Sequence, residues 1–253
     1  MNSYNVSSSS YTPYITYSLI GICVAVYLFT STNSIAFTEL FGLFLPENPH
    51  FQYWQYLTSI FMHGSVMHLL LNMLALWMFG GTLEKIWGSG RFLLFFLLCG
   101  IGAGIIYTWV NTYQFDQLTL ELQNLGLTKV DLQRLVDKGE YYMNIVGLTK
   151  QMATNYYVLF NIPTIGASGA IYGILVAFAM NFPNTKLILL FLPVPIAAKY
   201  FVPGIILIDL FAGFTGFSIF GDNIAHFAHV SGALVGFILV FLLGLNKQRI
   251  HSV

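Results

Sequence analysis

The sequence predicts an all-α polytopic membrane protein whose core is a bundle of six membrane-spanning helices. Of its 253 residues, 57% are hydrophobic and only 8% are charged, whereas a soluble domain carries about 25% charged residues. The apolar residues also gather into runs that approach the roughly 20 residues needed to cross about 30 Å of hydrocarbon. The formal net charge is zero, so charge gives no argument for a nucleic-acid partner.

Each apolar run is expected to form one span. The runs cover about 15–32, 60–80, 91–110, 168–182, 203–219 and 227–245. The fourth is short, because a helix from Ser168 to Phe182 rises only about 21 Å. We therefore divide the chain into an N-terminal segment (1–14), a six-helix domain (15–245) and a C-terminal tail (246–253).

A polar insert separates the third and fourth spans, at about 111–162. It contains "LTKVDLQRLVDKGEYYMNIVGLTKQM", which concentrates charges of both signs. This pattern predicts one or two amphipathic helices that rest at the membrane surface.

Basic residues in the short loops predict the orientation of the bundle, because lysine and arginine accumulate on the cytoplasmic side. They follow the second, fourth and sixth spans: Lys85, Arg91, Lys186, Lys199, Lys247 and Arg249. Both termini are therefore expected in the cytoplasm. The start of the chain lacks the basic region of a signal peptide, so the first run is expected to be retained as a span. Cys23 and Cys99 lie in apolar runs and are interpreted as small core residues.

In this topology, polar side chains within the even-numbered spans lie at one level, near the outer surface. The second span carries His63, His68 and Asn72 in its first half, and the last two lie four residues apart on one helix face. The fourth span begins at Ser168. The sixth begins with His226 and His229. Polar residues in spans usually face the bundle interior or a water-filled cavity, so we expect a single site.

These residue types suit hydrolysis by a serine nucleophile. Ser168 would attack a peptide carbonyl, with His229 as general base and then general acid. The backbone N–H of Ser168 and the side chains of His68 and Asn72 would stabilise the oxyanion. Tyr172 lies one turn after Ser168 and could pack against the ring of His229.

Small residues complete the prediction. Gly166 and Gly169 flank Ser168 and keep space and backbone N–H groups free beside it. Gly232 and Gly236 follow His229 at i+3 and i+7, which would let the sixth span approach the fourth closely.

With "HGSVMHLLLN", "GASG" with Tyr172, and "AHVSG" in this order and spacing, the sequence resembles the rhomboid family of intramembrane serine proteases. The likeness covers most of the chain apart from its N-terminal segment and the 111–162 insert. It implies a membrane-embedded loop after the first helix, a Ser168–His229 dyad that needs no aspartate, and His68 and Asn72 as oxyanion donors.

The resemblance also implies that the protein cleaves membrane-anchored proteins in or near their transmembrane segments, and that substrates enter between the second and fifth spans. "GGTLEKIWGSGRF" is similar to the family as well, with Glu84 as a structural partner near the cytoplasmic side. The family's usual Trp-Arg pair is here Trp54-Gln55, a departure that concerns the loop and not the dyad. No cofactor or metal is implied.

Simpler interpretations stay open for each residue. Ser168 could be only a helix cap, and His68 and Asn72 could be polar contacts between helices. We interpret His226 and His63 as structural, and Asp209 as a satisfied structural group or one near the cytoplasmic end.

Other functions fit the sequence less well. A metalloprotease would need His-Glu-x-x-His, and no histidine is followed by glutamate. A transporter would show internal repeats or paired broken helices, and neither is apparent in the sequence. An inactive rhomboid-like protein that binds client transmembrane helices remains the alternative, although such a protein should lack the serine or the histidine. The expected location is a bacterial cytoplasmic membrane, with the site opening to the outer side.

Overall fold

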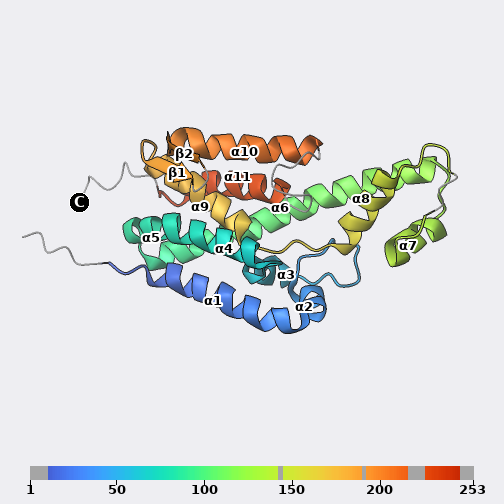
Figure 1. Ribbon diagram of the computed structural model, residues 1–253, viewed down its shortest axis with the longest axis horizontal. Coiled ribbons are helices and arrows are strands. Elements are labelled where there is room, and N and C mark those ends of the chain that lie inside the picture. The colour runs from blue at the N-terminus through green and yellow to red at the C-terminus, as the bar shows by residue number, and fades with distance from the viewer. Residues whose placement is uncertain (1–10, 142–144, 190–191, 216–225, 246–253) are drawn as a thin grey trace, which may run out of the picture.

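The structure, a computed structural model, is a mostly helical bundle drawn out along one axis (Figure 1). The described residues are 11–141, 145–189, 192–215 and 226–245. Four predicted stretches therefore lie wholly or partly outside them: most of the N-terminal segment, residues 142–144 of the insert, the end of the fifth run and the C-terminal tail.

Six apolar helical stretches correspond to the six predicted runs. They are α1 (Tyr14–Thr30), the continuous α4, η3 and α5 (Val66–Ala75, Leu76–Gly80 and Gly81–Trp87), α6 (Ser89–Asn124), α9 (Ser168–Asn181), α10 (Ala198–Thr215) and α11 (His226–Leu242). Within the described residues, four helical stretches are long and apolar enough to cross a membrane, and α9 and α11 are shorter apolar helices. The chain is thus a polytopic helical membrane protein, as predicted.

The connections contain structure that the sequence did not indicate. After α1 come η1 (Ser31–Asn33), α2 (Ser34–Phe41), α3 (Gln55–Thr58) and η2 (Ser59–Phe61). Between α9 and α10, the strands β1 (Lys186–Leu189) and β2 (Leu192–Ala197) form an antiparallel pair. The expectation of an all-α chain was wrong for this segment. Two prolines, Pro193 and Pro195, lie in β2, and proline disfavours a helix interior.

The core of the bundle lies where α9 packs against α6 and α11. A Cβ atom at Gly232 would lie 2.0 Å from the carbonyl oxygen of Gly169, and one at Gly236 would lie 2.4 Å from the Cα of Gly173. Only glycine permits such an approach between backbones. The close contact predicted between the fourth and sixth spans is therefore confirmed.

The segment predicted as a polar insert begins as a helix. With 36 residues, α6 is about 54 Å long and exceeds a hydrocarbon core of about 30 Å. The helices α7 (Lys129–Lys138) and α8 (Lys150–Asn161) pack against the last turns of α6. Both helices lie at the end of the molecule opposite to α5 and the β-hairpin (Figure 1).

The apolar faces of α7 and α8 pack on the end of α6. That the two helices rest at the membrane surface stays a prediction. Leu135 of α7 and Tyr156 of α8 join Phe115 and Leu122 of α6 in a second buried cluster. The two amphipathic helices thus bury their apolar faces against protein, because the extended α6 offers them a complementary surface.

Candidate active site

Ser168 is the first residue of α9, and its position is fixed from both sides. The segment before it is held by a hydrogen bond from the N–H of Gly166 to the carbonyl of Ser59 (2.9 Å) and by a bridge between Leu43 and Thr164. Ala167, directly before Ser168, is fully buried. No side chain among the described residues caps this end of α9, so its first N–H groups and their partial positive charge face the space beside Ser168.

His229 lies in the first turn of α11, and its Nε2 is 2.9 Å from the Oγ of Ser168. This distance is a normal hydrogen bond. The ring of Tyr172 stacks on the ring of His229, with centroids 4.4 Å apart and an interplanar angle of 14°. The structure therefore brings together the three residues that the sequence placed at the centre of the site.

The backbone of Gly166 lies between Ser168 and His68 and packs closely against the ring of His68. Its φ of +127° favours glycine, and a Cβ there would lie 2.7 Å from the Nε2 of His68 and 3.8 Å from the Oγ of Ser168. A side chain would therefore displace His68. Gly169 has a different role, because a Cβ there would lie 2.7 Å from the Cβ of Ala103 on α6.

Asn72 and His63 are less directly engaged. The amide nitrogen of Asn72 donates to the carbonyl of His68, one turn earlier in α4 (2.8 Å), which leaves one of its two amide hydrogens for another partner. The ring of His63 meets that of His68 edge to face, with centroids 5.1 Å apart. His63 is buried, and its Nε2 has no partner among the described residues.

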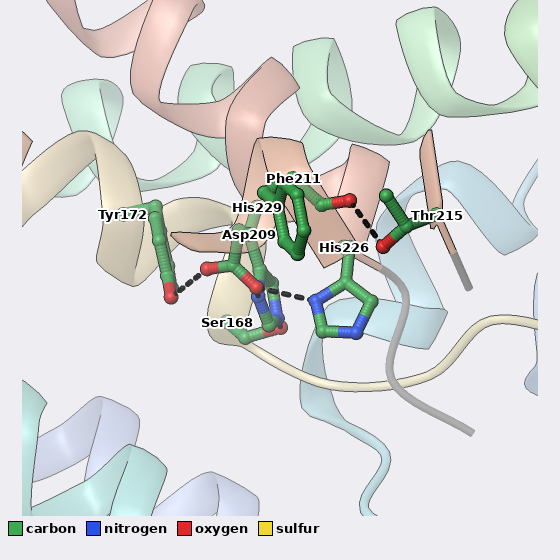
Figure 2. Close-up of polar contacts among 7 residues, drawn as sticks. All are labelled: Ser168, Tyr172, Asp209, Phe211, Thr215, His226 and His229. Atoms are coloured by element: carbon green, nitrogen blue, oxygen red, sulfur yellow. Dashed lines mark hydrogen bonds and ion pairs between the residues drawn. The ribbon is translucent and has the colours of Figure 1, made fainter. Parts of the chain in front are cut away.

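Asp209 was noted in the sequence, but no role in the site was assigned to it. Its Oδ1 lies 2.5 Å from the Nδ1 of His226 and 3.3 Å from the Nδ1 of His229. The hydroxyl of Tyr172 donates to its Oδ2, and Figure 2 shows these side chains converging. Of the two interpretations of Asp209, a satisfied structural group agrees with these hydrogen bonds. A position near the cytoplasmic end was wrong, because Asp209 lies beside the first turns of α9 and α11. An acid within an apolar span is the signal that could have identified it.

The same three residues are the candidates for a metal site. The ligand atoms of Asp209, His226 and His229 lie within 4.8 Å of one another. Two histidines and a carboxylate are a ligand set that zinc uses. In this structure Asp209 lies at hydrogen-bond distance from both histidines.

The loop after α1 is organised around Gln55, where the rhomboid pattern has arginine. Gln55 is fully buried. Its amide nitrogen donates to the carbonyl of His50 (2.8 Å) and its side-chain oxygen accepts from the N–H of Gln52 (3.2 Å). Trp54 donates to the carbonyl of Leu40 (3.0 Å). A neutral amide therefore supplies the loop contacts.

Comparison with known proteins gives a consistent match. The rhomboid domain matches residues 50–128 and 136–246. The rhomboid protease GluP of Bacillus subtilis is 28% identical over 197 residues, which are 78% of this chain and 27% of that protein. The rhomboid protease GlpG of Salmonella paratyphi A is 29% identical over 177 residues, 68% of this chain and 63% of GlpG. Rhomboid-like protein 15 of Arabidopsis thaliana is 29% identical over 161 residues, 60% of this chain and 38% of that protein. The chain thus spans less than two thirds of each relative.

Proposed function

The chain belongs to the rhomboid family, and on this premise we propose that it is an intramembrane serine endopeptidase. It would cleave membrane-anchored proteins in or near their transmembrane segments. The observation that carries the proposal is the 2.9 Å contact between Ser168 and His229 at the start of a short apolar helix. Two relatives of this chain are named rhomboid proteases.

The proposed reaction follows serine protease chemistry. The Oγ of Ser168 attacks the scissile carbonyl while its proton passes to the Nε2 of His229. His229 then gives this proton to the leaving amine, which leaves an acyl ester on Ser168. A water molecule, deprotonated by His229, hydrolyses the ester and restores the serine.

The oxyanion would lie between Ser168 and His68, near the backbone of Gly166. His68 would donate from one side, and the N–H of Ser168 lies at the N-terminus of α9, where developing negative charge is favoured. Asn72 would contribute its remaining amide hydrogen. These donors act in a site of low dielectric constant, where each is worth more than in water.

The proposed location is a bacterial cytoplasmic membrane, with the site opening to the outer side. Support comes from the basic residues, since Lys85, Lys186 and Lys199 lie at or next to the ends of helices remote from Ser168. The segment at 111–162 would then lie outside the cell, on the same side as the mouth of the site.

Cleavage of a single-span substrate tests the proposal. The purified protein is reconstituted in proteoliposomes with a model substrate whose transmembrane helix contains small and helix-destabilising residues. Wild type should yield two fragments on a gel, and Ser168→Ala should yield none while keeping the wild-type melting temperature. Ser31→Ala, which changes an exposed serine, is the matched control and should cleave normally. Unchanged cleavage by Ser168→Ala would refute the proposal, and capture of substrate without cleavage by wild type would favour the client-binding alternative.

A further inference from the structure

Asp209 connects three helices at the candidate site. It lies in α10, and its carboxylate receives hydrogen bonds from Tyr172 of α9 and from His226 and His229 of α11 (Figure 2). Its side chain is only 8% exposed. A buried carboxylate is costly unless several donors compensate for its lost hydration, so this group needs all three contacts.

The carboxylate determines which nitrogen of His229 carries the proton. An ionised carboxylate only accepts hydrogen bonds, so the Nδ1 that faces Asp209 must be the protonated nitrogen. The Nε2 of the neutral ring then presents its lone pair to the Oγ of Ser168, 2.9 Å away. This is the tautomer that can accept the proton of the serine.

His226 holds the carboxylate from a second direction. Its Nδ1 lies 2.5 Å from the same oxygen, and its Nε2 is buried without a partner among the described residues. A neutral ring with its proton on Nδ1 fits both observations. A doubly protonated imidazolium would instead bury an N–H at Nε2 that has no acceptor among the described residues. His226 therefore helps to fix Asp209, while His229 is the imidazole that contacts Ser168.

From these contacts we infer that Asp209 is a positioning residue for His229, an inference that rests on the proposed protease function. Asp209 selects the Nδ1–H tautomer, orients the ring together with Tyr172, and stabilises the imidazolium that forms when Ser168 loses its proton. Tyr172 and His226 keep the carboxylate in place. The protein thus adds to its Ser168–His229 pair an acid supplied by a different helix, as serine proteases with three-residue sites do.

The decisive variant is Asp209→Asn, which keeps the shape and removes the charge. Its amide can donate to Nδ1 of His229 and so favour the unproductive tautomer. We expect kcat for the model transmembrane substrate to fall about 10- to 100-fold, with KM and melting temperature close to wild type. Asp116→Asn makes the same change at an exposed position of α6 and should have no effect.

Two further measurements separate positioning from simple packing. Tyr172→Phe keeps the ring stacked on His229 and removes only the donor to Asp209, so kcat should fall about fivefold. In protein labelled with ¹⁵N-histidine, the His229 signal, assigned by its loss in His229→Ala, should report the Nδ1–H tautomer in wild type. In Asp209→Asn it should shift towards the Nε2–H tautomer.

The outcomes distinguish this inference from the proposed function. If wild type cleaves, Ser168→Ala does not, and Asp209→Asn keeps kcat within twofold of wild type, the protease stands and the role of Asp209 is refuted. A loss of activity in Asp209→Asn that is matched by the loss of folded protein would also refute it. If wild type neither cleaves nor reacts with a serine-directed probe, both proposals fail.

Discussion

Two buried carboxylates, Glu84 and Asp209, lie in apolar helices of the same bundle and have very different partners. Glu84 of α5 is fully buried and accepts hydrogen bonds from the backbone N–H groups of Ile15 (3.0 Å) and Thr16 (2.8 Å) at the start of α1. The hydroxyls of Thr16 and Ser89 also donate to it. Asp209 is bonded to a tyrosine and two imidazoles.

The comparison shows that burial alone does not reveal what an acid does. The partners of Glu84 are amides and hydroxyls that keep their protons near neutral pH, so Glu84 can only join α1 to α5 and α6. The partners of Asp209 include two imidazoles, a group that can serve as general acid and general base in catalysis. An acid beside such groups, within reach of a serine, can influence a reaction.

Replacing Glu84 should have the largest effect on stability. Glu84→Ala leaves the N–H groups of Ile15 and Thr16 without their acceptor, which should cost about 4 kcal/mol and lower the melting temperature by roughly 10 °C. Glu121→Ala, at an exposed position of α6, is the control. Cleavage per folded molecule should stay at the wild-type level. If Glu84→Ala lost activity but kept the wild-type melting temperature, Glu84 would act on the reaction rather than on stability, and the contrast with Asp209 would be wrong.

The Asp209 end of the bundle depends on the close approach of α11 to α9. Gly232→Ala would force a methyl group against the backbone of Gly169, at a cost of about 3 kcal/mol. It should also separate Ser168 from His229, so activity should fall further than the folded fraction. Gly21→Ala, where nothing lies within 4 Å of the new atom, should be neutral. Equal behaviour of the two variants in melting and cleavage assays would contradict this packing.

A third carboxylate, that of Asp131, is partly exposed, and its replacement should have a smaller effect than replacement of Glu84 or Asp209. Asp131 forms a capping box with Thr128 at the start of α7, and hydrogen bonds from the Thr128 hydroxyl and N–H lower the pKa of its carboxyl below the ordinary 3.8. Because the folded pKa is lowered, its contribution is complete above the ordinary value and is lost as pH falls through the lowered pKa.

Hydrogen exchange in the first turn of α7 measures this contribution. Exchange should be faster in Asp131→Asn than in wild type at about pH 6, and the difference should vanish near pH 2. A difference that persists or grows on acidification would show that the carboxylate does not stabilise this turn.

The sequence contains most of the site but not all of its partners. The topology and the motif order predicted Ser168 and His229 at one depth in the membrane, with Tyr172 one turn away. The glycines of α11 were predicted from their spacing after His229. Asp209 was misplaced because its span was expected at 203–219, which puts it in the cytoplasmic half. The helix instead begins at Ala198, so Asp209 lies in the second half of Ala198–Thr215.

The rest depends on tertiary contacts that no local pattern encodes. Residues 111–124 looked like the start of a polar insert, yet they extend α6, because Phe115 and Leu122 on one face are covered by α7 and α8. The second amide hydrogen bond that Asn72 would need for the oxyanion likewise depends on a bound substrate. Helix rotation and packing decide such features.

The most direct test of the account is labelling of the detergent-solubilised protein with a fluorophosphonate probe, which reacts with an activated serine. Wild type should be labelled, whereas Ser168→Ala and His229→Ala should not, although both keep the wild-type melting temperature. Absence of labelling in folded wild type, or labelling that survives in Ser168→Ala, would contradict the assignment of Ser168 and His229 as nucleophile and base.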